Sequence, residues 1–312
     1  MIEAFELTKR YGDKTAVDHI SFTIPPGSVT GFLGPNGAGK STTMRMIVGL
    51  DRPTSGSVTV NGKPYAQHRS PLAEVGVLLD AKAVHTGRSA RSHLRTMAAT
   101  HGISTKRVDE VIEMTGLAGV ARKRVGGFSL GMGQRLGIAS AMLGDPRTLI
   151  LDEPVNGLDP EGVQWVRHLV RRLAEEGRTV FLSSHLMSEM AQTADQLLVI
   201  GRGRIITSGP VREVIDAAIG ATVRIRSPRL GELARLLAGD GVTHTWTGDG
   251  AIDARGITAA QIGDTAALHG IPIHELHAQN ASLEDAYMNL TQDAVEYHSE
   301  DLPGLGHEGE LR

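Results

Sequence analysis

The sequence contains no cysteine, which excludes disulfide bonds and thiolate chemistry. It also lacks any run approaching the roughly 18 consecutive apolar residues that a membrane-spanning helix needs. The first residues, MIEAFELTKR, carry two glutamates and no long apolar segment, so they do not form a signal peptide. An excess of basic charge is missing too: the net charge is −3, whereas nucleic-acid-binding proteins usually present a basic face. We therefore expect a soluble, cytoplasmic protein that reaches a membrane only through a partner.

The composition is that of a globular protein, with 40% hydrophobic and 21% charged residues over 312 positions. In the first half, strand-like runs alternate with helical patterns. SVTGFL (28–33) is rich in β-branched and aromatic residues, and TLILDEP (148–154) is a continuous apolar run that ends in acids. Such a run is typical of a parallel strand buried on both faces. The alternation predicts an α/β fold with a parallel sheet.

Two regions depart from this alternation. Between residues 87 and 144 the pattern is mostly helical, with three helical blocks and no strong strand, which predicts a helical subdomain inserted into the α/β core. Near the end of the first half, QLLVIGRGRIITSG (196–209) predicts a hairpin that turns at Arg202 and Gly203.

The last third of the chain has a different order of strand-like and helical patterns. A bridging helix is expected at 210–221, and the order of patterns over 222–278 is βαββαβ, the order of a ferredoxin-like domain. The last strand of this unit is expected within IPIHELHA (271–278). A C-terminal helix at 279–298 and a flexible, solvated tail at 299–312 complete the prediction.

A phosphate-binding loop is indicated by GPNGAGKS (34–41), which matches G-x-x-x-x-G-K-[ST] between a predicted strand and a predicted helix. Glycines let backbone N–H groups surround phosphate oxygens, and the helix N-terminus adds a positive dipole. Lys40 is expected to reach the β- and γ-phosphates, and Ser41 to ligate Mg²⁺. A glycine-rich turn with an unrelated lysine is the alternative. The residues expected to bind the nucleotide are Gly34, Pro35, Asn36, Gly37, Ala38, Gly39, Lys40, Ser41 and Thr42.

An acidic pair ends the apolar run LILDEP. A carboxylate at the end of a buried strand is unfavourable unless something compensates it, and Mg²⁺ bound to phosphate would compensate Asp152. Glu153 is then placed to polarise an attacking water. His185 ends the next strand, in SSH, where it could orient the water or Glu153. Each residue alone would be an ordinary solvent-facing strand end; the phosphate loop upstream favours the functional interpretation.

Taken in order, these motifs resemble the ATP-binding-cassette ATPases. GPNGAGKST, LILDEP, GLDP and SSH occur in that family's order and approximate spacing, and FSLGMGQRLGIA (128–139) resembles its signature segment. The resemblance implies a P-loop cassette over residues 1–209, with an antiparallel β subdomain and a helical insertion. It also implies a head-to-tail dimer that holds two ATP molecules with Mg²⁺. The dimer would be a homodimer or a pseudo-dimer with a similar ATPase.

The resemblance assigns further roles. Ser129 and Gly131 of the signature segment would contact the γ-phosphate held by the opposite subunit, and Asp159 in GLDP would lie at the same interface. Ser129 is equally a good N-cap for the helix that follows it, and the two roles are compatible. Tyr11 matches the aromatic residue that stacks on adenine, with an ordinary core or surface tyrosine as the alternative.

Two departures from the family pattern matter. The signature usually reads leucine-serine-glycine-glycine-glutamine, whereas residues 128–132 read FSLGM. The family's glutamine loop is expected after a strand like EVGVLL, and the residue there is Asp80. A carboxylate could still approach Mg²⁺, but it adds negative charge and shortens the reach. We therefore expect slow hydrolysis of ATP unless a partner is bound.

The layout of the last third resembles ATPase subunits of bacterial drug exporters, including the daunorubicin-resistance type, in which the membrane permease is a separate chain. This implies a peripheral location on the inner face of the cell membrane, through that permease, and no nucleic acid. Two alternatives stay open. One is a soluble cassette ATPase that acts on nucleic acid or ribosomes, and the other is a regulatory nucleotide-binding module with weak hydrolysis.

Overall fold

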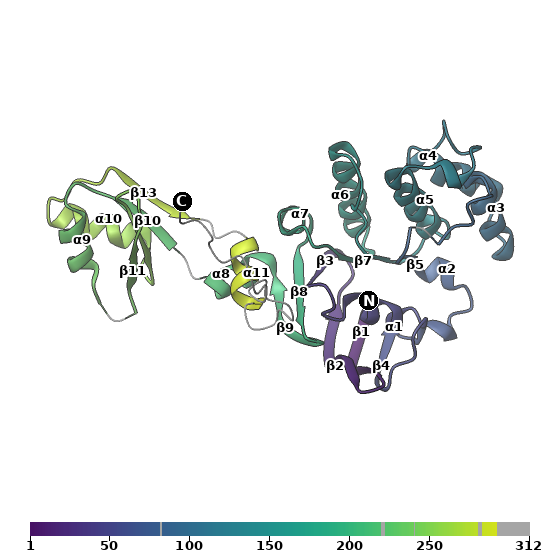
Figure 1. Cartoon of the computed structure of the whole chain (residues 1–312), viewed down its shortest axis with the longest axis horizontal. Coiled ribbons are helices and arrows are strands. Elements are labelled where there is room, and N and C mark those ends of the chain that lie inside the picture. The colour runs from purple at the N-terminus through teal and green to yellow at the C-terminus, as the bar shows by residue number, and fades with distance from the viewer. Residues whose placement is uncertain (82, 220–221, 240, 280–282, 292–312) are drawn as a thin grey trace, which may run out of the picture.

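The computed structural model describes residues 1–81, 83–219, 222–239, 241–279 and 283–291. In Figure 1 the chain is elongated, with a bundle of helices at one end, sheets with their covering helices in the middle, and a small separate sheet at the other end. The predicted fold class, an α/β cassette core followed by a small α+β unit, is confirmed.

A six-stranded sheet forms the centre of the first 210 residues, in the order β5-β6-β7-β3-β8-β9. The pairs from β5 to β8 are parallel, and β9 closes the edge as an antiparallel hairpin with β8. That hairpin turns at Arg202 and Gly203, both at positive φ, as expected. The strands are β3 (Ser28–Leu33), β5 (Val75–Leu78), β6 (Thr148–Leu151), β7 (Thr179–Ser183), β8 (Gln196–Gly201) and β9 (Arg204–Pro210).

A second, antiparallel sheet of three strands lies against the first, in the order β2-β1-β4. Its strands are β1 (Ile2–Tyr11), β2 (Lys14–Ile24) and β4 (Ser55–Val60), and α1 (Lys40–Ile47) follows β3. The core between the sheets is one apolar cluster. Within it the Phe181 ring centroid lies 5.1 Å from that of Phe32 and 6.3 Å from that of Phe22. Because Phe32 near the end of β3 belongs to this cluster, the packing fixes where β3 ends and α1 begins.

The segment predicted as helical contains three helices, which gather away from the three-stranded sheet (Figure 1). They are α3 (Ala90–Thr100), α4 (Thr105–Met114) and α5 (Leu130–Met142), preceded by the short α2 (Pro71–Glu74); 3₁₀ turns lie at Tyr65–Gln67 and Val125–Gly127. A serine caps the N-terminus of each of the three long helices. Helix α5 packs on β5 so closely that a Cβ on Gly137 would lie 2.5 Å from Leu78.

Two further helices cover the central sheet. Helix α6 (Pro160–Glu175) buries Val166, Leu169, Val170 and Leu173, which recur at helical spacing along one face. Helix α7 (Met187–Thr193) is short and lies between β7 and β8 in the chain. It buries Met190, whose sulfur fills the space beside Gly31 of β3.

The last third forms a separate four-stranded antiparallel sheet in the order β11-β12-β10-β13, with its own apolar cluster. The elements run α8 (Val211–Ile219), β10 (Thr222–Arg226), α9 (Leu230–Leu237), β11 (Thr243–Trp246), β12 (Ile252–Arg255), α10 (Ala259–Leu268) and β13 (Glu275–Gln279). From β10 onward this is the βαββαβ order read from the sequence. One strand starts later than expected: β13 begins at Glu275 because Pro272, which has no N–H to donate, interrupts the run at 271–274.

Helix α11 (Leu283–Thr291) returns to the cassette, where it packs against α8 and α7 (Figure 1). Leu283 and Ala286 are buried, and Leu283 belongs to the same apolar cluster as the inner face of α6. The rest of the predicted helix, at 280–282 and 292–298, and the tail at 299–312 lie outside the described residues. Within the described part of the chain, no helix has both the length and the apolar character to cross a bilayer.

Candidate ATP-binding and hydrolysis site

The predicted phosphate loop joins β3 to α1 and depends on its glycines. Gly37 and Gly39 have φ of 82° and 109°, in the left-handed region that glycine tolerates best. A Cβ on Gly39 would lie 2.6 Å from the carbonyl oxygen of Ala16, and one on Gly34 would lie 2.4 Å from that of Ile200. The backbone of this loop is therefore pressed against its neighbours, and side chains at these two positions would displace it.

Lys40, the first residue of α1, is almost completely buried, with 8% of its surface exposed. Its Nζ donates hydrogen bonds to the carbonyl oxygens of Gly34 (2.6 Å) and Pro35 (3.2 Å). Burial lowers the pKa of Lys40, and the nearby carboxylates of Glu153 and Asp152 partly oppose that shift. Lys40 also lines a cavity of about 230 Å³. The cavity is lined by Ala16, Asn36, Gly37, Gly39, Lys40, Ser41, Thr42, Asp152 and Glu153.

The two residues expected to hold Mg²⁺ are in contact. Ser41 Oγ donates to Asp152 Oδ2 at 2.7 Å, and Ser183 Oγ donates to the other oxygen of the same carboxylate. A hydroxyl and a carboxylate offer the oxygen ligands that Mg²⁺ prefers. No cluster of three or more histidine or acidic side chains that could hold a metal occurs among the described residues. This donor set fits Mg²⁺ held by a few protein oxygens together with phosphates, rather than an all-protein cage.

Glu153 is held at three points in an uncommon backbone conformation. Its φ is 50°, in the left-handed region that glutamate rarely adopts. Its N–H donates to Ser183 Oγ (3.0 Å), and its carbonyl oxygen accepts from Gln134 Nε2 (2.9 Å). Its carboxylate Oε2 lies 2.7 Å from His185 Nδ1. Such a conformation costs of order 1–3 kcal/mol and persists where surrounding contacts over-determine it.

Sequence patterns did not single out two of these residues. Gln134 comes from α5 and is 4% exposed, and Ser183 is the fully buried last residue of β7. Both stand inside motifs that were recognised, FSLGMGQRLGIA and SSH. The motif position alone did not show that their side chains turn toward Glu153, because that orientation depends on how α5 and β7 pack beside β6.

We expect Gln134→Leu to slow ATP turnover by about tenfold, which corresponds to about 1.4 kcal/mol, because the substitution removes one of the two donors to the Glu153 carbonyl oxygen and leaves only the N–H of Asn156 (3.2 Å). The measurement is phosphate release at saturating ATP. Gln164→Leu, the same change at an exposed position of α6, is the matched control and should leave turnover unchanged. Normal turnover of Gln134→Leu would contradict a role for this hydrogen bond.

The residues expected at a dimer interface lie outside this cavity. Ser129 caps α5 by accepting a hydrogen bond from the Met132 N–H, as predicted, and Asp159 caps α6 by accepting one from the Gly162 N–H. A Cβ on Gly131 would lie 3.1 Å from the carbonyl oxygen of Gly157, so the signature segment and the GLDP segment are neighbours. Neither Ser129, Gly131 nor Asp159 lines the cavity around Lys40 of its own chain.

Tyr11 and Asp80 also lie outside the cavity lining. Tyr11 is 49% exposed, and its hydroxyl donates to Asp51 Oδ2 at 3.0 Å, while Lys9 Nζ lies 5.0 Å from its ring centroid. An exposed ring next to the start of β2 is available for stacking. Asp80 is exposed after β5, so its approach to a metal stays a prediction.

Comparison with known proteins agrees with this geometry. A family model described as ABC transporter matches residues 17–156, and a model described as a domain of unknown function matches residues 221–284. The bacitracin transport ATP-binding protein BcrA of Bacillus licheniformis is 43% identical over 213 residues, which cover 67% of this chain and 70% of that protein. The uncharacterized ABC transporter ATP-binding protein YhcH of Bacillus subtilis is 35% identical, over 95% of this chain and 97% of its own length.

A solved structure gives the same picture. CbiO1 of Clostridium perfringens, part of the ABC transporter complex CbiONQ, is 28% identical to this chain with a TM-score of 0.58. The match covers 75% of this chain and 98% of CbiO1. The family resemblance inferred from the motifs is therefore confirmed. The chain belongs to the ABC transporter ATP-binding proteins, a family of ATPases that bind ATP through this cassette.

Proposed function

We propose that this chain hydrolyses ATP in the two shared sites of a head-to-tail dimer and thereby powers a separate membrane permease that exports drug-like or hydrophobic compounds. One observation carries the proposal. The cavity around Lys40 brings together the phosphate loop, Ser41, Asp152 and Glu153, and His185 contacts the Glu153 carboxylate. This set of groups suits phosphoryl transfer to water.

In this proposal each group has a defined task. The loop N–H groups and Lys40 bind the phosphates, and Ser41 with Asp152 would hold Mg²⁺, which neutralises charge on the phosphate oxygens. Glu153 orients the attacking water and accepts its proton. His185, in contact with the Glu153 carboxylate, would orient that carboxylate toward the attacking water. Tyr11 would stack on the adenine.

A second subunit completes the site. Ser129 and Gly131 begin α5, whose N-terminal N–H groups and dipole favour a negative ligand. Following the family resemblance, we assign these residues to the γ-phosphate of the opposite subunit, with Asp159 at the same interface. Their position outside the cavity of their own chain is compatible with this assignment. The second subunit is another copy or a similar ATPase.

The cargo class is inferred from relatives. BcrA is named for bacitracin transport, SrtF of Streptococcus pyogenes for lantibiotic transport, and a relative in Sinorhizobium fredii for Nod factor export. We propose an exporter subunit held at the inner face of the membrane by its permease. Residues 1–209 would act as the ATPase domain, with its helical subdomain at about 87–144, and residues 222–278 as an accessory domain.

The test is a mild-detergent pull-down of the tagged protein from its native host, with the co-purifying chains identified by mass spectrometry. We expect a polytopic membrane protein, and faster ATP turnover when the two are reconstituted together. Ribosomal proteins or nucleic acid in the eluate would instead support a soluble cassette ATPase. Tight ATP binding without turnover, even beside the permease, would support a regulatory module. Fast turnover without any partner would contradict the expected dependence on it.

A further inference from the structure

We propose that Arg167 of α6 is a positioning residue for hydrolysis. Through an ion pair with Glu189 of α7, it fixes that helix and thereby holds His185 against Glu153. The inference rests on the proposed roles of His185 and Glu153, and it adds a residue that no motif of the sequence indicated.

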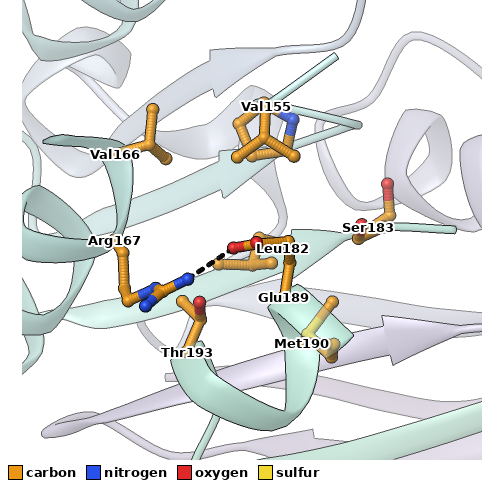
Figure 2. A pocket seen from close by; sticks show the side chains of 10 residues that line it. Val155, Val166, Arg167, Leu182, Ser183, Glu189, Met190 and Thr193 are labelled. Carbon is orange, nitrogen blue, oxygen red and sulfur yellow. Dashed lines mark hydrogen bonds and ion pairs between the residues drawn. The ribbon is translucent and has the colours of Figure 1, made fainter. Parts of the chain in front are cut away.

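The ion pair is close and partly shielded from water. Arg167 Nη2 lies 2.6 Å from Glu189 Oε2, with the two side chains 22% and 27% exposed (Figure 2). The Nε of Arg167 is buried and has no hydrogen-bond partner among the described residues. The ion pair with Glu189 is therefore the main contact that offsets the desolvation of this guanidinium charge. A partly desolvated charge that loses its partner is more unfavourable than an exposed one. The pair therefore resists separation more than an ordinary surface pair would.

The pair spans a small cavity between the two segments that carry the site residues. Its lining includes Pro154 and Val155, directly after Glu153, and Leu182, Ser183 and Ser184, directly before His185. Figure 2 labels Val155, Leu182 and Ser183 of these. The cavity has a volume of only about 20 Å³, room for about one water molecule, so it is not a ligand site. Arg167 and Glu189 line it as well. A shift of Glu189 would thus alter the packing of both the segment that follows Glu153 and the segment that precedes His185.

Helix α7 depends on such external contacts for its position. It has seven residues and no side-chain cap, and it begins two residues after His185. An isolated helix of this length is not stable in water, so its position is set by what it packs against. Arg171, one turn after Arg167 on α6, donates a second hydrogen bond, to the carbonyl oxygen of Gln192 (2.8 Å). Two arginines on one face of α6 therefore hold both halves of α7.

This arrangement links the catalytic contact to the proposed dimer interface. Helix α6 starts at Asp159, its N-cap, and Arg167 lies two turns further along the same helix. On another side, α11 packs against α7. Arg167 thus connects the helix that begins at the proposed interface to the short helix that begins two residues after His185.

The test uses charge reversal. We expect Arg167→Glu and Glu189→Arg each to lower the kcat for ATP about 10- to 100-fold, because both displace His185 from Glu153. ATP binding, measured with a fluorescent ATP analogue, should stay unchanged, because neither residue lines the nucleotide cavity. The double variant Arg167→Glu/Glu189→Arg restores the pair and should restore most of kcat. Arg167→Lys, which keeps the charge, should retain most of it too. Arg172→Glu, at an exposed position of α6, is the control.

A purely structural pair would give a different pattern: ATP binding and thermal stability would fall together with kcat. That pattern would overturn the inference. Normal kcat in both single variants would overturn it too, as would a double variant that does not recover kcat. His185→Ala is measured alongside to separate it from the proposed function. If His185→Ala turns over normally, the proposed role of His185 fails. If it is slow while Arg167→Glu is normal, only the positioning role of Arg167 fails.

Discussion

Glu153→Gln is expected to slow ATP hydrolysis by about 10²- to 10⁴-fold while leaving ATP binding intact. The amide has nearly the same shape as the carboxylate but cannot accept the proton of the attacking water. The backbone contacts to Ser183 and Gln134 do not involve the Glu153 side chain, so the left-handed conformation at this position should survive. Phosphate release gives the turnover, and a fluorescent ATP analogue gives the binding.

The same variant tests the shared site. With ATP bound and not hydrolysed, Glu153→Gln should accumulate as a dimer that size-exclusion chromatography resolves from the monomer. Glu175→Gln, an exposed carboxylate at the end of α6, is the control and should turn over and elute as the unchanged protein does. A Glu153→Gln protein that binds ATP but stays monomeric would contradict the proposed contact of Ser129 and Gly131 with the opposite γ-phosphate.

Lys40→Met is expected to weaken ATP binding by about 10- to 100-fold, which corresponds to about 1.4–2.8 kcal/mol. Methionine keeps an unbranched chain but removes the only lysine in the cavity lining and its hydrogen bonds to the carbonyl oxygens of Gly34 and Pro35. Charge-assisted hydrogen bonds to phosphate are among the stronger ones in proteins. Calorimetric titration with ATP measures the loss.

Lys106→Met is the matched control, because the Lys106 side chain is 88% exposed and remote from the cavity lining. If Lys40→Met bound ATP as tightly as the unchanged protein but lost turnover, the lysine would stabilise the transition state of hydrolysis and not the bound ATP.

Burial lowers the pKa of Lys40, so the charged form is lost at a lower pH than for an exposed lysine. ATP affinity of the unchanged protein should accordingly begin to fall at a lower pH than an ordinary lysine would give.

Some elements were not recognisable from local pattern. Strand β1 (Ile2–Tyr11) mixes apolar and charged residues and shifts register against both neighbours, with Glu6 at positive φ, so it shows no clean alternation. Strand β4 (Ser55–Val60) opens with Ser-Gly-Ser, a sequence typical of a turn. Both become strands because they pair with each other and cover the shared apolar core. The antiparallel sheet had been expected only through the family resemblance.

The sequence by itself determined the phosphate loop, the acidic end of β6, the parallel α/β core and the family. Each of these features depends on short contiguous segments, in which backbone conformation and hydrophobic period follow from neighbouring residues. Only the tertiary structure decided what surrounds Glu153. Its partners Gln134, Ser183 and His185 lie 19, 30 and 32 positions away in the chain, and they come from different elements. Arg167 and Glu189 meet in the same way, 22 positions apart. Contacts of this kind depend on how buried helices and strands pack, which no local pattern records.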